Sequence, residues 1–280
     1  MTLVTRERQF LGTLITAAIM FLSSMMGTFL ILSYDVALSS HGTSMESEIS
    51  FIPNYADTIQ TSSAHSSLDT KYFIQNLRGD TIATLLHWNL MENERLAVNI
   101  VNSDTISQDQ LDALKNAILS EETIQINDSL NHKGLSGQST YYMGWVGALK
   151  HASESATEFY IPTEFVILES TKGEGDITIN LVTYQDSDGY TGLTKSITES
   201  NQILKSTITI YDVHSLSFEQ IATITRHEFG HALGLAHSTA PEDLMAPQIT
   251  TPYPYISECD IDALKALYDG KRSSQIVCER

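Results

Sequence analysis

Basic residues and cysteines are both scarce in this chain of 280 residues. Lys and Arg number 16 against 34 Asp and Glu, which gives a formal net charge of −18. This balance argues against nucleic acid as a partner, because phosphate binding needs clustered Lys and Arg and the chain has neither a basic run nor a Gly-rich phosphate loop. The only cysteines, Cys259 and Cys278, lie near the C-terminus, so a cysteine–histidine nucleophile pair does not compete with the chemistry described below.

Hydrophobic residues make up 42% of the chain and aromatic residues 8%. A sizeable core can therefore be buried, and the length allows one large domain or two small ones. One run, from Phe10 to Leu32, contains no charged residue. As a helix it would measure about 35 Å, enough to cross the ~30 Å hydrocarbon core of a membrane.

The charges on either side of this run predict its orientation. Arg6 and Arg8 precede it and acidic residues follow it. The positive-inside rule then places residues 1–9 in the cytoplasm and everything after the transmembrane anchor at 10–32 outside the cell membrane. The alternative is a cleaved signal peptide with Ala37-Leu38-Ser39 as its cleavage site, which would make the protein secreted.

The segment 33–94 is predicted to link the anchor to the folded domain. Its first half is rich in Ser, Thr, His and Asp and has little apolar periodicity, so it cannot bury enough surface to offset its ordering entropy. Residues 71–94 are more apolar and are expected to pack on the domain as a short strand pair. The domain itself is predicted to cover 95–280.

The most specific pattern is His-Glu-x-x-His-x-x-Gly-x-x-His, which ends at His237. His227 and His231 are four residues apart, so on a helix their rings lie on one face and can share a metal ion. Gly234 can take a positive φ and end the helix, which lets the chain fold back and bring His237 to the metal. Three protein ligands leave one position of a tetrahedral zinc open, the arrangement of a catalytic site. Histidines that merely fill a core are the alternative, and the fixed spacing argues against it.

Met245 follows eight residues after His237, within Pro-Glu-Asp-Leu-Met-Ala-Pro. With this methionine the chain resembles the metzincin zinc endopeptidases, and within them the matrixins, the matrix metalloproteinase family. The resemblance is strong at 217–247 and looser elsewhere between residues 95 and 270. It implies an α+β fold in which helices back a twisted, mixed, mostly parallel sheet, with a small C-terminal part that carries the Met-turn and a final helix.

The resemblance also implies zinc-dependent hydrolysis of peptide bonds in proteins or peptides. Zinc held by His227, His231 and His237 would lower the pKa of its water towards ~7 and polarise the scissile carbonyl. Glu228 would act as general base, and Met245 would shape the floor of the site without binding the metal. Two alternatives stay open: a catalytically inactive, membrane-tethered binding module, and a zinc amidase or other non-peptide hydrolase.

Local patterns predict the elements of the domain. Ser107 with Gln110, and Ser217 with Gln220, form capping-box pairs that predict the starts of two helices. A further helix is expected near 141–153. Strands are expected at 96–101, 163–169, 176–184 and 203–211, with a weaker edge segment at 190–197.

The chain departs from the matrixin pattern in several places. No cysteine precedes residue 259, so a cysteine switch from an N-terminal propeptide cannot operate, and 183–202 holds no histidine for a second, structural zinc. Residues 121–139 are expected to be an insertion. Asp186 and Asp188 are candidates for a structural calcium loop, because carboxylates suit a hard cation, with an ordinary polar turn as the alternative.

Substrate is expected to bind beside an antiparallel edge strand that matches 190–196. An extended peptide would pair with the free N–H and C=O groups of this edge, around Gly192 and Leu193. Pro247 and Ile249 would bound the pocket beside the zinc, and Ile249 favours an apolar side chain just after the cut bond. The alternative is that 190–196 is a surface loop.

Cys259 and Cys278 are predicted to form a disulfide, because the domain is expected to lie in an oxidising compartment. The bridge would pin the C-terminal tail against the last helix. The alternative is a buried Cys259 and a free Cys278.

Overall fold

The computed structural model describes residues 68–76, 85–127, 138–271, 274 and 276, with the side chains of 73–76 excepted. These residues belong to one compact unit that spans 62–280. Among them, no helix combines the length and the apolar character needed to cross a membrane. The predicted anchor at 10–32 lies outside the described residues.

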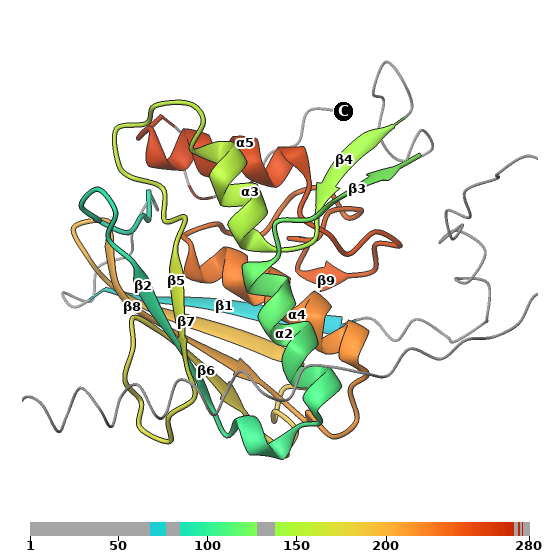
Figure 1. Ribbon diagram of the computed structural model, residues 1–280. Helices are drawn as coiled ribbons and strands as arrows, with labels where there is room; N and C mark the ends of the chain where they lie inside the picture. The colour runs from blue at the N-terminus through green and yellow to red at the C-terminus, as the bar shows by residue number, and fades with distance from the viewer. Residues whose placement is uncertain (1–67, 77–84, 128–137, 272–273, 275, 277–280) are drawn as a thin grey trace, which may run out of the picture. The chain divides into compact units, whose positions relative to one another are not determined.

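A seven-stranded mixed sheet underlies the helices (Figure 1), with the strand order β5-β2-β6-β8-β7-β1-β9. Four neighbouring pairs are parallel, whereas β7 with β8 and β1 with β9 are antiparallel. The expected mixed, mostly parallel sheet is confirmed. Its strands are β1 (Leu68–Asn76), β2 (Leu96–Val101), β5 (Phe165–Leu168), β6 (Ile177–Leu181), β7 (Gly192–Glu199), β8 (Gln202–Ile210) and β9 (Gln248–Ile249).

The position of β1 differs from the sequence prediction. Residues 71–94 are expected to pack, as a short strand pair, on a domain that begins at residue 95. Instead, β1 is a single strand inside the main sheet, and His87 makes an isolated bridge to Gln202. The predicted boundary at 95 therefore lies inside the compact unit, because main-chain pairing ties the preceding segment to β7 and β8.

Four helices pack above the sheet in the view of Figure 1: α2 (Gln108–Leu119), α3 (Trp145–Ala152), α4 (Phe218–Ala232) and α5 (Glu258–Tyr268). Both predicted capping boxes are present, at Ser107 and Ser217, and Ser257 with Asp260 forms a third. The helix α4 packs directly against β7 and β8, and α2 packs on α4.

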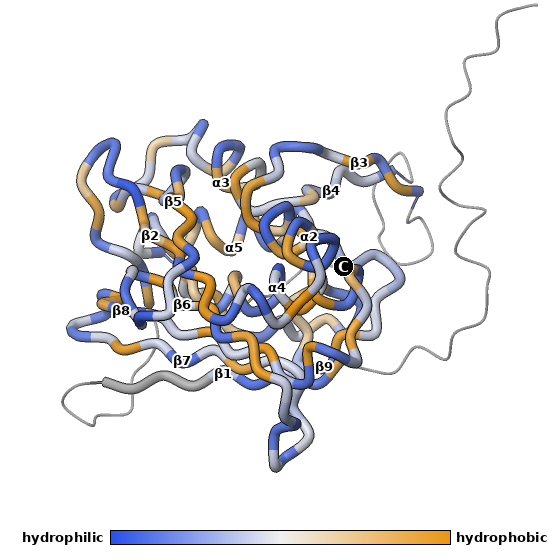
Figure 2. Tube along the Cα trace, turned by 60° about the horizontal axis from the view of Figure 1, so that its bottom comes forward, coloured by the Kyte–Doolittle hydropathy of each residue, from blue (hydrophilic) through white to orange (hydrophobic). Residues whose placement is uncertain are grey.

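The core lies between α4 and the sheet. Hydrophobic residues follow the strands and helices, whereas the connecting loops are largely hydrophilic (Figure 2). In β7 the residues 192, 194, 196 and 198 are buried, and 195 and 199 are exposed, as the two-residue period of a strand requires. The buried face of β7 meets α4, so small side chains at 192, 194 and 196 lie next to the helix that carries the histidine motif.

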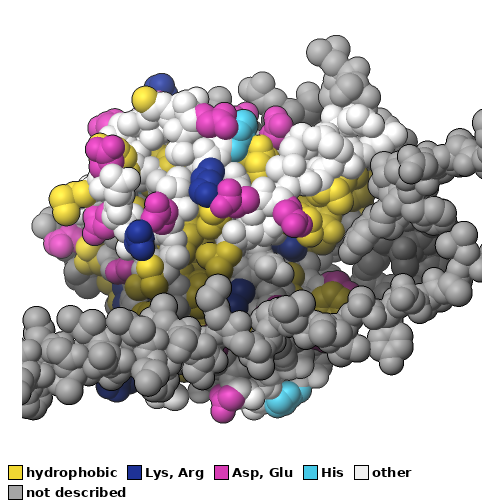
Figure 3. Space-filling model, in the orientation of Figure 1, with side chains coloured by type: hydrophobic (Ala, Val, Ile, Leu, Met, Phe, Trp, Pro, Cys, Tyr) yellow, Lys and Arg dark blue, Asp and Glu magenta, His cyan; other side chains and the backbone are white. Residues whose placement is uncertain are grey.

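The expected insertion forms a hairpin of β3 (Thr123–Ile126) and β4 (Ser139–Tyr142), whose tip at 128–137 lies outside the described residues. Tyr142 also exchanges two main-chain hydrogen bonds with Ile256, at 2.9 and 3.1 Å. The hairpin is thereby joined to the C-terminal part that follows β9. On the face shown in Figure 3, carboxylates are spread widely, and the few Lys and Arg side chains among the described residues form no cluster.

Candidate metal centre and cleft

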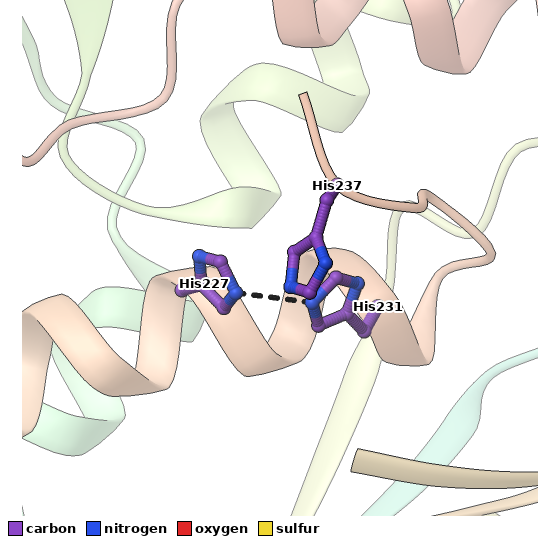
Figure 4. Close-up of side chains that lie close together, drawn as sticks. All are labelled: His227, His231 and His237. Atoms are coloured by element: carbon purple, nitrogen blue, oxygen red, sulfur yellow. Dashed lines mark hydrogen bonds between the residues drawn. The ribbon is translucent and has the colours of Figure 1, made fainter. Parts of the chain in front are cut away.

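The helix α4 brings His227 and His231 together on one face (Figure 4). Both side chains are fully buried, and their ring centroids lie 4.6 Å apart. The capping box at Ser217 fixes where the helix begins. The spacing of four residues then places the second ring one turn beyond the first.

The turn after α4 brings in the third histidine. Gly234 has φ +107, and a Cβ at this position would lie 2.1 Å from the backbone oxygen of Leu86, so only glycine fits. The turn leads to His237, whose ring centroid lies 4.7 Å from that of His231 and 5.5 Å from that of His227. The convergence of three histidines predicted from the motif is confirmed.

Hydrogen bonds to backbone carbonyls determine where the ring protons of two histidines lie. His227 Nδ1 lies 2.7 Å from Leu244 O, and His231 Nδ1 lies 2.8 Å from Leu235 O. A carbonyl oxygen only accepts, so each neutral ring carries its proton on Nδ1. Burial lowers the pKa of His227 to about 3 and that of His231 well below its ordinary value, which keeps both rings neutral.

The two Nε2 atoms therefore face each other with lone pairs, at a distance of 3.0 Å. Two lone pairs at this distance repel unless a cation lies between them. The Nε2 of His237 is buried and lacks a hydrogen-bond partner among the described residues. The ligand atoms of all three rings lie within 4.8 Å of one another. Three neutral imidazoles with inward lone pairs fit zinc, the metal that matrixin histidine triads bind.

Glu228 lies beside this cluster and is fully buried. Its Oε2 accepts a hydrogen bond from Thr194 Oγ1 at 2.5 Å, and Oε1 is buried without a partner in the described part of the chain. Burial raises the pKa of Glu228 to about 8, and the Thr194 hydrogen bond opposes that rise. A metal cation held by the neighbouring histidines would lower this pKa and favour the ionised carboxylate, the form that accepts a proton. One carboxylate oxygen is thus fixed and the other is left to act on a reactant.

Met245 packs against the helix that carries two of the histidines, and its role as a Met-turn residue stays a prediction. Its side chain is fully buried, and its Sδ would lie 2.7 Å from a Cβ placed on Gly230 of α4. Its carbonyl accepts the N–H of Ser238 at 2.8 Å, next to His237. Met245 therefore supports both the helix and the turn that hold the histidines.

The predicted substrate edge is a strand, but the outer edge of that strand is not free. β7 is paired with β1 in parallel, from Thr70 opposite Gly192 to Asn76 opposite Thr198. On its other side β1 pairs antiparallel with β9, so that Leu68 lies opposite Ile249. The expectation of an exposed edge at 190–196 is therefore corrected: residues 68–76 fill the space between β7 and β9.

The remaining predicted residues occupy separate places. Pro247 directly precedes β9, Ile249 is the second residue of β9, and Leu193 lies on β7. Asp186 Oδ2 accepts the backbone N–H of Asp188 at 2.9 Å, which makes a local turn. Within the described residues the three histidines are the only group of three or more metal-binding side chains, so calcium at the aspartates stays a prediction.

Cys259 is disulfide-bonded. Cys278 lies outside the described residues, so the pairing of these two cysteines stays a prediction.

Sequence reasoning missed three residues of the site. Thr194 holds Glu228, Thr70 Oγ1 lies 2.8 Å from His227 Nε2, and the Tyr72 ring stacks on His231 with centroids 4.4 Å apart. Threonine and tyrosine are ordinary strand residues, so these residue types did not indicate a place in the site. The only local indication of a close approach between β7 and α4 is the run of small residues on the buried face of β7.

Comparison with known proteins finds that part of the chain is similar to one family. The model of the matrixin family matches residues 147–269. Matrix metalloproteinase-20 of Homo sapiens is 45% identical over 53 residues, which are 18% of this chain and 11% of that protein. Probable matrix metalloproteinase 095L of Invertebrate iridescent virus 3 is 38% identical over 70 residues, or 25% of this chain and 19% of that protein. Each match spans less than two thirds of the relative's length.

Proposed function

Residues 147–269 of this chain are a matrixin family domain, and from this premise we propose that the protein is a zinc endopeptidase acting on protein substrates. The observation that carries the proposal is the buried cluster of His227, His231 and His237. Two of its ring nitrogens face each other across 3.0 Å with lone pairs, and a carboxylate with one unpaired oxygen lies alongside. A binding module needs no such carboxylate, which supports catalysis.

Zinc held by His227, His231 and His237 would supply Lewis acidity, which would lower the pKa of water towards ~7 and polarise a carbonyl oxygen. The chain's own part in the reaction is proton transfer and positioning. Glu228 accepts the proton of the attacking water at Oε1 and donates it to the leaving amine. Thr194 holds Oε2 at 2.5 Å, so the carboxylate keeps one orientation while the proton moves.

The walls on either side of the cluster are suited to an extended peptide. β7 on one side and β9 on the other offer main-chain groups that can hold a third strand between them, as they hold β1. Such pairing gives affinity that is largely independent of sequence. Ile249, buried in β9, provides an apolar surface, so we expect a preference for an apolar side chain just after the cut bond.

The proposal includes a location. Phe10 to Leu32 contains no charged residue and is long enough to cross a bilayer, and Arg6 and Arg8 precede it. The segment would anchor the protein with the enzyme outside the cell membrane, or would be removed to give a secreted form. Protease added to intact cells should then digest residues 62–280. A unit that stays protected while a known surface protein is digested would contradict this location.

The test of the activity is hydrolysis of denatured casein by the full-length chain. We expect cleavage that stops on treatment with a zinc chelator and returns when zinc is restored. A catalytically inactive binding module predicts no cleavage, although it would retain one zinc per chain. Cleavage of an N-acylated amino acid without cleavage of casein would indicate an amidase instead.

A further inference from the structure

We propose that Asp243 and Asp260 form a buried carboxyl pair that shares one proton and positions the turn that supports the zinc ligands. Asp243 lies in the turn that contains Met245, and Asp260 lies in the first turn of α5. The proposal concerns how firmly the histidine cluster holds its metal, and it does not depend on the peptidase activity proposed above.

Both carboxyl groups are removed from solvent. Asp243 is 5% exposed and Asp260 is 0% exposed. One carboxylate oxygen of Asp260, Oδ2, completes the capping box of α5 by accepting hydrogen bonds from Ser257 N at 2.9 Å and from Ser257 Oγ at 3.0 Å. The other oxygen, Oδ1, is buried and accepts no hydrogen bond from an N–H or hydroxyl group of the described residues. A buried carboxylate oxygen without a donor costs free energy, so Oδ1 requires a partner of another kind.

Asp243 provides that partner, because its carboxyl group lies within hydrogen-bonding reach of the Asp260 carboxyl group. An ionised carboxylate only accepts, so two ionised groups at this distance would repel each other. With one proton between them, one carboxyl group donates to the other. Burial first, and Asp243 second, raise the pKa of Asp260 well above its usual range, against the hydrogen bonds from Ser257. The direction of this change agrees with a proton that the pair retains.

No Lys or Arg among the described residues offsets the charge of the pair, since Asp243 is the one charged group that acts on Asp260. The other charged side chains of the neighbouring elements reach solvent or bind other groups of the chain. They are Glu242 beside Asp243, Glu258, Asp262 and Lys265 of α5, Lys150 and His151 of α3, and Arg226 of α4. The strand β4 also packs on α5, but its tyrosines stay neutral far above the pH at which carboxyl groups titrate.

Asp243 determines the shape of its turn. Its Oδ1 accepts the N–H of Met245 at 3.3 Å. Its backbone N–H donates to Ala240 O at 3.2 Å, and its carbonyl accepts the N–H of Ala246 at 3.2 Å. The link to Asp260 ties this turn to the start of α5. A displacement of the Asp243 side chain is therefore transmitted to the backbone of residues 243–246.

The same turn contacts the surroundings of two zinc ligands. Leu244 O accepts the proton of His227 Nδ1 at 2.7 Å. Met245 O accepts the N–H of Ser238 at 2.8 Å, next to His237. Hydrogen-bond partners behind metal ligands orient them, and their loss typically lowers metal affinity about 10- to 100-fold. The carboxyl pair thus acts on the ligands through Leu244 and Met245.

The pair makes the metal centre sensitive to pH. While the pair keeps its proton, the hydrogen bond between the two carboxyl groups holds the turn against α5. As the pH rises through the raised pKa, the pair loses this proton and two buried negative charges repel each other. The contribution of the pair to zinc retention is therefore full at low pH and is lost as the pH rises.

The test compares four zinc-loaded full-length proteins: the wild type, Asp243→Asn, Asp243→Ala and a matched control, Asp262→Asn, whose site on α5 is 78% exposed. Infrared difference spectra report protonated carboxyl groups, and a coloured chelator reports the rate of zinc loss, both from about pH 5 to about pH 9. Asp243→Asn replaces the shared proton with an amide N–H, which can hold Asp260 at every pH. Comparison with this variant removes the effect of histidine protonation, which all four proteins share.

We expect a carboxylic acid band at about pH 6, where ordinary carboxyl groups are ionised, in the wild type and in Asp262→Asn but not in Asp243→Asn. The wild type should lose zinc at the rate of Asp243→Asn while the band persists, and about tenfold faster once the band has disappeared. Asp243→Ala, which lacks the link altogether, should lose zinc about tenfold faster than Asp243→Asn throughout.

A wild type without the band at about pH 6 would overturn the shared proton. Zinc loss that changes at a different pH from the band would overturn the link between the pair and the metal, and so would equal zinc loss from Asp243→Ala and Asp243→Asn. If Asp243→Ala does not fold, the wild type and Asp243→Asn still decide both points. Neither measurement uses casein, so the absence of peptidase activity would leave this proposal standing, whereas a wild type that binds no zinc would overturn it.

Discussion

Gly192 and Glu228 approach so closely that a Cβ at residue 192 would lie 2.3 Å from Glu228 Oε1. Oε1 is the carboxylate oxygen to which the mechanism assigns proton transfer. The strand β7 thus determines the position of the Glu228 carboxylate in two ways. Thr194 donates a hydrogen bond to Oε2, and the absence of a side chain at Gly192 leaves room for Oε1. Gly192, first expected to bind substrate, also has this second role.

Gly192→Ala should displace the Glu228 carboxylate without removing a zinc ligand. A shift of about 1 Å in a reacting group can lower the rate about 100-fold. We expect such a loss of casein cleavage with the zinc content unchanged. Gly173→Ala is the matched control, because a Cβ there meets nothing within 4 Å. Full activity in Gly192→Ala would show that the carboxylate tolerates the displacement.

Arg226 connects the histidine helix to the segment that follows β9. It is buried, its Nε donates to Met143 O at 2.7 Å, and its Nη1 donates to Pro254 O at 3.2 Å. Arg226→Met leaves these carbonyls without their donor and should lower the free energy of unfolding by about 3 kcal/mol. Arg95→Met, at an exposed ion pair with Glu164, should change it by less than about 1 kcal/mol. Equal effects in urea unfolding would refute the assigned role of Arg226.

Asp260 should give the protein a recognisable pH dependence. Complete burial, with Asp243 nearby, holds the pKa of Asp260 well above its usual range, despite hydrogen bonds from Ser257. The folded state therefore keeps a proton that the unfolded state releases above about pH 4. The stability from this group is fully present below that pH and is lost as the pH rises towards the folded pKa.

Asp260→Asn imitates the protonated acid and removes this dependence. We expect the free energy of unfolding of the wild type to fall relative to that of Asp260→Asn as the pH rises from about 4 to about 7. Urea titrations of both proteins across this range provide the measurement. A difference between them that stays constant with pH would show that Asp260 is ionised in the folded protein.

The C-terminal tail supports the third zinc ligand. Ala236 N donates to Ser274 O at 2.7 Å, and Thr239 N donates to Ile276 O at 3.3 Å, on either side of His237. A bridge from Cys259 to Cys278 would anchor this tail. Cys278→Ser should therefore lower zinc affinity about tenfold, the scale of changes that loosen a ligand's surroundings. Chelator competition measures the affinity, and two reactive thiols in the denatured, unreduced wild type would exclude the bridge.

Sequence predicted those parts of the molecule that depend on neighbouring residues. The helix starts at Ser107 and Ser217 follow from capping boxes four residues long, and the histidine cluster follows from spacing along one helix and one glycine turn. These interactions are local, so the residues that make them are close together in the chain.

Pairings between distant segments were not predictable in the same way. Thr70 lies opposite Gly192, and Arg226 contacts carbonyls on either side of it in sequence, at Met143 and Pro254. Neither contact leaves a periodic or turn signal in the sequence. The register of β1 depends on a parallel partner more than 100 residues away, and a parallel pair has no connecting hairpin to fix it.

The central claim is that one zinc and Glu228 together hydrolyse peptide bonds, and paired zinc and activity assays on Glu228→Ala test it most directly. Glu219→Ala, an exposed position in the first turn of the same helix, serves as the matched control. We predict that both variants bind one zinc per chain, that Glu219→Ala cleaves casein like the wild type, and that Glu228→Ala loses activity about 100- to 10,000-fold. Wild-type cleavage by zinc-loaded Glu228→Ala would contradict the account.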